Sequence, residues 1–189
     1  MRYVAFFRGI NVGGKNIVQM AELRQLFVNL GFQDVKSYIQ SGNVLFSSEA
    51  DKPALAPLIA EAFETRFGFQ STVILRSDAE LTGILRSLPF QAAEIARAEE
   101  QAPEVEHLYV YLSDAAIDRE SVGRLCGAYE GADRLHAAEY ELYLLCAKSI
   151  RESKLASLLA KLPQALTARN FKTLGKIAAM LESPDTAGK

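Results

Sequence analysis

The sequence of 189 residues contains no tryptophan and only two cysteines and two histidines. Cys126 and Cys146 stand apart in apolar surroundings, which predicts two buried free thiols, as in a reducing cytosol, rather than a disulfide. The cysteines and histidines do not have the spacing of a metal site, so we predict no metal and no cofactor. No apolar run approaches 18 residues and no basic, then apolar leader opens the chain, so we expect a cytoplasmic protein without a membrane partner.

Neither sign of charge dominates the composition. The 21 basic and 23 acidic residues leave a net charge of −2, and the pI is about 5.8. An extended basic surface for DNA or RNA is therefore not expected, and nucleic acid is not a predicted partner. The hydrophobic content of 49% is typical of a globular protein with a real core.

The first half of the chain shows the periodicities of strands and helices in a mixed order. Apolar runs predict strands at 3–8 and 71–76, and a hairpin of 34–40 with 43–48 joined through Ser41-Gly42. Helical spacing predicts helices at 20–30 and 55–67. Ser77 and Glu80 form a capping box ahead of a further helix that extends to Leu88.

The second half repeats this order after the segment 91–106, which is rich in glutamate and has a proline near its end. Strands are predicted at 107–112, 133–138, 141–146 and 165–170, with the middle pair joined through Glu139-Tyr140. Helices are predicted at 117–129, 155–162 and 174–181. Ser149 and Glu152 have the spacing of a second capping box.

These element orders predict an α+β fold. Each half reads β-α-β-β-α-β, so we expect a tandem of two ferredoxin-like units with antiparallel sheets and extra helices. The predicted boundaries are 1–90 for the first unit, 91–106 for a connecting segment and 107–189 for the second unit with the C-terminal helix. Each unit alone would be small and marginally stable, so the two are expected to pack together.

Residues 9–15 have the spacing G-x-x-x-x-G-K of a phosphate-binding Walker loop. The next position should be a serine or threonine that ligates Mg²⁺, but Asn16 stands there. Helical periodicity begins only near Met20, so no helix dipole faces the loop. The two predicted hairpins also require antiparallel sheets, whereas P-loop folds use parallel β-α-β units. We therefore reject a P-loop NTPase.

Three blocks of sequence resemble a known family. They are RGINVGGKN at 8–16, M..LR..F..LGF..V.SYIQSGNVLF at 20–46, and ARNFKTLGKIAAML at 168–181. Together they resemble the bacterial family known as domain of unknown function 1697. The last block usually reads R-N-W-x-T-V in that family, and here Phe171 and Leu174 are apolar replacements. The resemblance implies a tandem of ferredoxin-like units and supplies no reaction.

The polar loop that follows the first strand is the first candidate site. Its glycines allow a ligand to approach the backbone, and its two cations favour an anion. The alternative is a tight connection in which asparagines cap their own backbone. The candidate ligand-binding residues of this loop are Arg8, Gly9, Asn11, Gly13, Gly14, Lys15 and Asn16.

Two further stretches add candidate residues. Gln40 and Asn43 flank the first hairpin turn, although turn chemistry accounts for that sequence as well. Asn170 is the predicted N-cap of the last helix, and Arg169 and Lys172 would favour an anion beside that N-terminus. We expect this stretch to meet loop 9–16 in one joint site, with Arg169 and Lys15 facing solvent.

Three functions remain open from the sequence. The first is a protein that binds a small anionic or nucleotide-like ligand near loop 9–16. The second is an enzyme that acts on such a ligand without a metal, using Arg8 and Lys15 to stabilise charge. The third is a module that binds RNA or protein. Tyr109 and Tyr111 could form an aromatic RNA platform, but the RNP1 pattern is missing.

Overall fold

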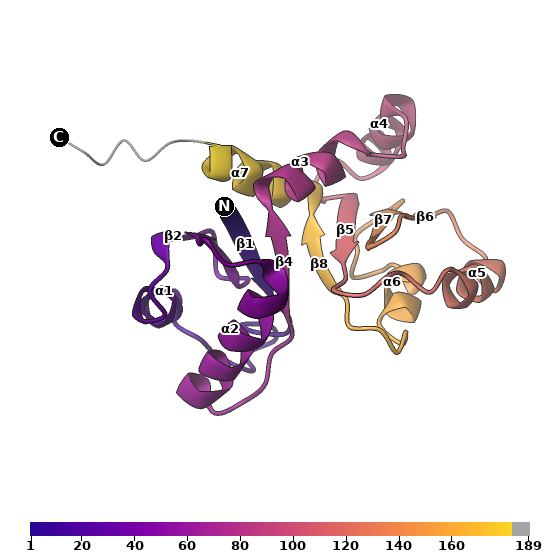
Figure 1. Cartoon of the computed structure of the whole chain (residues 1–189). Coiled ribbons are helices and arrows are strands. Elements are labelled where there is room, and N and C mark those ends of the chain that lie inside the picture. The colour runs from indigo at the N-terminus through magenta and orange to yellow at the C-terminus, as the bar shows by residue number, and fades with distance from the viewer. Residues whose placement is uncertain (183–189) are drawn as a thin grey trace. The chain divides into compact units, whose positions relative to one another are not determined.

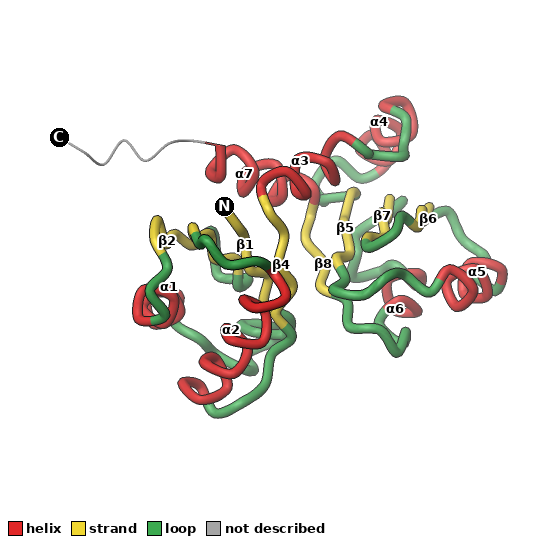
Figure 2. Tube along the Cα trace, viewed as in Figure 1, coloured by secondary structure: helices red, strands yellow, loops and turns green. Residues whose placement is uncertain are grey.

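The structure is a computed structural model that describes residues 1–182 of the 189. Within that range the chain is a mixed α+β protein with two four-stranded antiparallel sheets and seven α-helices. Figures 1 and 2 trace these helices and strands along the chain. The same residues contain no helix that is long and apolar enough to cross a membrane. The predicted α+β class and both antiparallel hairpins are confirmed.

The chain forms two compact units, and the first is discontinuous in sequence. It consists of Met1–Gly83 together with the chain from Gly175, whereas the second consists of Ile84–Leu174. The predicted boundaries of 1–90, 91–106 and 107–189 placed the whole C-terminal helix in the second unit. Within the described residues, that helix is shared between the two.

The first unit is built around a sheet of order β2-β3-β1-β4. The central strand β1 is antiparallel to both neighbours, with Ala5 opposite Val44 of β3 and Leu75 of β4. The elements of this unit, in chain order, are β1 (Arg2–Phe7), α1 (Met20–Asn29), β2 (Gln33–Ser37), β3 (Asn43–Ser47), α2 (Lys52–Phe67) and β4 (Val73–Ser77).

The second unit has the corresponding order β6-β7-β5-β8. Its central strand places Val110 opposite both Tyr143 of β7 and Arg169 of β8. The elements of the unit are β5 (Leu108–Leu112), α5 (Arg119–Gly127), β6 (Arg134–Ala137), β7 (Glu141–Leu145), α6 (Lys154–Leu159) and β8 (Thr167–Asn170). Helix α4 (Ala92–Gln101) precedes β5, while α3 (Asp78–Arg86) and α7 (Phe171–Glu182) cross the unit boundaries.

Each unit buries one face of its sheet against its own pair of helices. In the first unit, alternate β1 side chains such as Phe7 pack with α1 and α2 residues such as Phe27 and Phe63. In the second, Tyr111 and Leu144 pack with Leu155 and Leu159 of α6. Period-2 strands and amphipathic helices thus build both cores.

Several details of the elements differ from the prediction. The first hairpin link is not the pair Ser41-Gly42 but the five residues 38–42, because β2 ends at Ser37. The predicted Ser149–Glu152 capping box is wrong: α6 begins at Lys154, and the hydroxyl of Ser153 accepts the hydrogen bond from the Ala156 amide at 2.9 Å. The Ser77–Glu80 capping box at the start of α3 is present.

Candidate functional site

Loop 9–16 leaves the end of β1 and folds into a small hairpin of its own. Val12 and Lys15 form an isolated antiparallel bridge, in which the Lys15 amide donates to the Val12 carbonyl at 3.1 Å. The two residues between them, Gly13 and Gly14, have φ values of 59° and 73°. Positive φ at both central positions is typical of a two-residue type I′ turn, which favours glycine. The paired glycines therefore have a structural reason that is independent of any ligand.

Asn11 joins this loop to the neighbouring turn 38–42. Its side-chain amide donates to the carbonyls of Val18 at 2.9 Å and Gln40 at 2.8 Å. Its side-chain oxygen accepts from the Val18 amide at 2.8 Å, and its own amide donates to the Asn16 carbonyl at 3.1 Å. Four hydrogen bonds thus close the base of the loop, and Asn11 is a structural residue.

The other two asparagines of the first unit's candidate set also support the backbone. The Asn16 side chain donates to the Gly9 carbonyl at 3.1 Å. Asn43 is fully buried, and its side-chain amide donates to the Tyr38 carbonyl and the Ser41 hydroxyl, each at 3.0 Å. The capping role considered for the asparagines is therefore present, and Asn43 does not reach the surface. The Gln40 side chain is exposed.

Left-handed backbone is concentrated in these two loops. Asn11, Asn16 and Ile39 have φ values of 55°, 52° and 50°. For a β-branched residue such as Ile39 this conformation costs on the order of 1–3 kcal/mol. The hydrogen bonds of Asn11 and Asn43 hold the backbone in this arrangement, so the loop surface is preorganised.

The remaining candidates of the loop face solvent. Residues 12–17 are all exposed, as are Arg8 and Gly9. Neither Arg8 nor Lys15 makes an ion pair with any residue among 1–182. In the same range, the Gly13 and Gly14 amides donate no hydrogen bond to protein. Two cations and exposed glycines whose amides bond to no described protein group are the elements of an anion-binding surface.

The second candidate stretch, 169–172, lies in the second unit, and its side chains are engaged there. The guanidinium of Arg169 is buried and donates to the Thr167 hydroxyl at 2.9 Å, and burial lowers its pKa to about 10. The expectation that Arg169 faces solvent is wrong. The predicted N-cap is confirmed, since the Asn170 side chain accepts from the Thr173 amide at 2.7 Å. Lys172 pairs with Glu106 at 3.0 Å.

The candidate residues therefore fall into two groups. The structure brings together loop 9–16 with Gln40 and Asn43 in the first unit. It assigns the candidates Arg169, Asn170 and Lys172 to the second unit. The joint site of the two groups stays a prediction.

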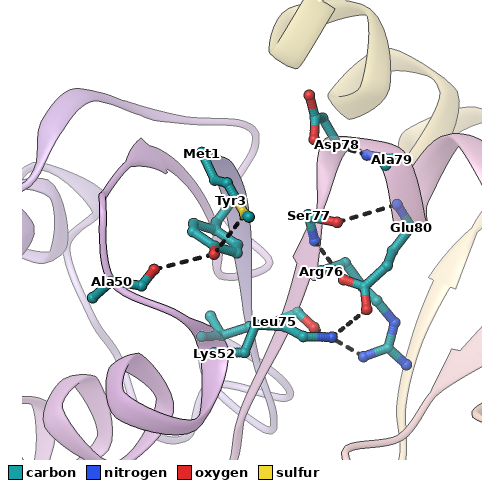
Figure 3. Close-up of polar contacts among 10 residues, drawn as sticks. All are labelled: Met1, Tyr3, Ala50, Lys52, Leu75, Arg76, Ser77, Asp78, Ala79 and Glu80. Atoms are coloured by element: carbon teal, nitrogen blue, oxygen red, sulfur yellow. Dashed lines mark hydrogen bonds and ion pairs between the residues drawn. The ribbon is translucent and has the colours of Figure 1, made fainter.

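A polar cluster at the end of β4 was not among the candidates (Figure 3). Lys52 of α2 forms an ion pair with Glu80 of α3, and the Glu80 carboxylate accepts from the Ser77 amide at 2.8 Å. Burial opposes ionisation of Glu80, but the hydrogen bonds from Lys52 and Ser77 outweigh it and hold its pKa below the ordinary value. The only signal in the sequence was the capping-box spacing.

The same close-up shows the hydroxyl of Tyr3, which donates to the Ala50 carbonyl at 3.1 Å. Burial, with the negative charges of Asp51 and Glu80 nearby, raises the pKa of Tyr3. Arg76 is buried, and its guanidinium donates to the Leu75 carbonyl at 2.9 Å. The Tyr3 and Lys52 contacts connect different elements, and Arg76 bonds within its own strand, so we assign the cluster a structural role.

Two groups with nucleophilic or acid–base chemistry, His107 and Cys146, are also held in structural positions. His107 is buried, and its Nδ1 and Nε2 lie 2.7 Å and 2.9 Å from the Cys146 and Ala102 carbonyl oxygens. Burial raises the pKa of the Cys146 thiol to about 12, which keeps it protonated at neutral pH. Among residues 1–182, no group of three His, Cys, Asp or Glu side chains could hold a metal ion.

Fold and loop together define a two-unit α+β protein with an exposed, basic, glycine-bearing loop after its first strand. The family described as protein of unknown function (DUF1697) matches residues 1–143, and the chain belongs to this family. The resemblance seen in the sequence blocks is thereby confirmed. No curated protein matches the chain.

A solved structure supports the same fold over nearly the whole chain. It is that of the conserved bacterial protein SP0830 from Streptococcus pneumoniae, which is 31% identical to this chain with a TM-score of 0.75. The similarity covers 96% of this chain and 98% of the other.

Proposed function

We propose that this protein binds a small anionic or nucleotide-like ligand at loop 9–16. The observation that carries the proposal is the pair of exposed cations, Arg8 and Lys15, without an ion pair in the described chain and beside glycine amides that donate to no protein group there. A phosphate oxygen could accept from these amides while the cations neutralise its charge. Of the three open functions, binding needs no group beyond those present in the loop.

We also infer that the two sheets form a tandem of ferredoxin-like units. The support is the order β2-β3-β1-β4, repeated as β6-β7-β5-β8, together with a β-α-β-β-α-β order in each unit. We further propose a cytoplasmic location, which the two free thiols support.

The asparagines have a supporting role in the proposed site. Asn11 and Asn16 hold the loop closed, so the exposed members that would contact a ligand are Arg8, Gly9, Gly13, Gly14 and Lys15, with Gln40 beside them. Lys172 would complete the site if the second stretch converges on the loop.

Thermal unfolding in inorganic phosphate tests the proposal. A ligand that binds only the folded state adds RT ln(1 + [L]/Kd), or about 1.4 kcal/mol at ten times Kd. Lys15→Ala and Arg8→Ala should each reduce that gain without lowering stability in chloride, because both side chains are exposed. Lys161→Ala, which removes an exposed lysine in the second unit, is the matched control.

Two-dimensional NMR adds a residue-level measurement. Phosphate should shift the amide resonances of Gly13 and Gly14 and leave those of Gly68 and Gly123 unchanged. If phosphate and sulfate stabilise wild type and Lys15→Ala equally, loop 9–16 is only a connection. Loss of the gain in Lys172→Ala would support the joint site, and an unchanged gain would confine the site to the first unit.

A further inference from the structure

Loop 9–16, the residue that follows it and turn 38–42 also expose aliphatic side chains. Val12 is 65% exposed, Ile17 is 67% exposed and Ile39 is 50% exposed. The two segments that carry them are joined by the hydrogen bond from Asn11 to the Gln40 carbonyl. These side chains leave half or more of their surface uncovered in the folded monomer, and apolar side chains exposed on adjoining segments with polar neighbours are typical of an interaction surface.

The charged residues of these two segments are of one sign. Residues 8–18 and 38–43 contain Arg8 and Lys15 and no aspartate or glutamate, whereas the chain as a whole has a net charge of −2. We call the exposed residues Arg8, Val12, Lys15, Ile17 and Ile39 the basic-apolar surface. A complementary partner carries carboxylates or phosphates next to apolar groups.

The surface is held in one conformation before any partner binds. The positive φ values of Asn11, Asn16 and Ile39 are fixed by hydrogen bonds at the base of both loops. A partner therefore does not have to order these loops when it binds, which lowers the free-energy cost of association.

We propose that the basic-apolar surface docks a short acidic segment of another protein, in which carboxylates alternate with aliphatic side chains. The carboxylates would accept hydrogen bonds from Arg8 and Lys15, and the aliphatic groups would cover Val12 and Ile17. This inference rests on the proposed function, because the same cations and glycine amides recognise the anionic groups.

The size of the surface decides between kinds of partner. A stable interface between folded domains uses about 20–30 residues on each side, far more than this surface offers, so a short segment fits better. Recruitment to anionic membranes typically uses clusters of about four to eight basic residues, whereas two are present here. The acidic balance of the remaining chain would also oppose an anionic membrane.

Fluorescent peptides of ten residues test the proposal on the full chain. The probes are alternating Asp-Leu, alternating Asp-Ser and alternating Lys-Leu peptides, and binding is followed by anisotropy. The Asp-Leu peptide should bind at least about tenfold more tightly than Asp-Ser, and Lys-Leu should not bind. The double variant Val12→Ser, Ile17→Ser should reduce Asp-Leu binding to the Asp-Ser level and leave phosphate stabilisation unchanged.

Two variants and two outcomes complete the design. Ile39→Ser tests the second loop, and Leu58→Ser, which removes an aliphatic side chain that is 43% exposed on α2, is the matched control. Equal binding of Asp-Leu and Asp-Ser peptides, with phosphate stabilisation intact, overturns the docking proposal and leaves the proposed function standing. Tighter binding to anionic phosphatidylglycerol vesicles than to the Asp-Leu peptide, lost in the double variant, would assign the surface to lipid instead.

Discussion

Gly42 lies where turn 38–42 meets the end of β1 and the start of the candidate loop. Its φ is 75°, and a Cβ at this position would lie 2.7 Å from Cδ1 of Ile10 and 3.0 Å from Cβ of Phe7. We therefore expect Gly42→Ala to lower the free energy of unfolding by about 2–4 kcal/mol, since left-handed strain and overpacking add. Denaturant unfolding gives the measurement.

Gly68 provides the control for this substitution. Its φ of 76° is nearly the same, but nothing lies within 4 Å of a Cβ added there. Gly68→Ala should therefore cost only about 1 kcal/mol, the strain contribution alone. Equal losses of unfolding free energy in the two alanine variants would mean that the close packing of Gly42 against Ile10 does not constrain the loop.

The cysteines differ more than their sequence surroundings suggest. Cys146 is buried and Cys126 is exposed, and both are free. The prediction of two free thiols is thus confirmed, whereas the prediction that both are buried is wrong for Cys126. In the native protein we expect a maleimide to modify Cys126 alone, because the pKa of Cys146 is raised to about 12 and its sulfur is enclosed. Intact mass should show one adduct before denaturation and two afterwards.

At this scale the sequence predicted backbone-supporting residues better than charged ones. Asparagine at a turn or before a helix has few alternatives to bonding the nearby backbone, so Asn16, Asn43 and Asn170 have the roles that turn and cap chemistry favours. The burial of Arg169 depends on tertiary packing, which cannot be read from the residues next to it in the sequence.

At the scale of elements, an ion pair connects the capping box at the start of α3 to helix α2. Glu80 accepts from the Ser77 amide and pairs with Lys52 (Figure 3). Because the pKa of Glu80 is lowered in the folded state, its contribution to stability is present above the pKa of the unfolded chain. That contribution is lost as the pH falls through the folded-state pKa.

We therefore expect Glu80→Gln to destabilise the protein at neutral pH by about 0.5–1 kcal/mol, because the Lys52–Glu80 pair is partly exposed and solvent screens it. The difference from wild type should shrink as the pH is lowered from about 7 to about 3. Unfolding free energies measured across this range test the expectation. Glu61→Gln, on the exposed side of α2, is the control and should change the free energy of unfolding little at neutral pH. A difference that is constant with pH would exclude the ion pair and the charged cap as its source.

The helices and strands around residues 9–15 also decide whether these residues form a Walker loop. The glycines form a hairpin turn, α1 begins only at Met20, and both sheets are antiparallel. A P-loop instead cradles phosphate between a parallel strand and a helix that begins at the lysine. We expect no Mg²⁺-dependent hydrolysis of ATP or GTP above a denatured control, measured by phosphate release. Turnover that disappears in Lys15→Ala would contradict this expectation.

Element type was predictable where periodicity is strong, as in α1 and β1, and less so where two loops meet. The first hairpin link is five residues rather than two. The Tyr38 amide donates to the Asn43 carbonyl, so the turn begins several residues before the Ser41-Gly42 pair. Similarly, α6 uses Ser153 as its cap, and a second serine four residues earlier has the same local chemistry. Local spacing does not choose between such alternatives.

At the scale of the whole molecule, the repeated order of elements was readable from alternation and turn signals. The sequence did not indicate that the chain from Gly175 belongs to the first unit. An amphipathic helix such as α7 gains most of its stability from the surface that it packs against. Its buried side chains Leu174, Ile177 and Leu181 show which face is covered, but their spacing in the sequence carries no information about which unit covers it.

The net charge of the whole molecule leads to the last expectation, which concerns nucleic acid. Tyr111 is 8% exposed and belongs to the core of the second unit, where Tyr109 packs against it, so these tyrosines do not form an open stacking platform. With a net charge of −2, few phosphates can be neutralised at once, so the affinity for nucleic acid should be low.

We expect binding of single-stranded RNA to be weak at low salt and absent near about 0.15 M salt in a filter or anisotropy assay. Lys15→Ala should remove part of the weak binding, because Lys15 belongs to a local excess of positive charge, whereas Tyr109→Ala should not change it. A sub-micromolar complex at the higher salt that is abolished by Tyr109→Ala would contradict the packing argument. It would make RNA, rather than a small anion, the leading ligand of this family member.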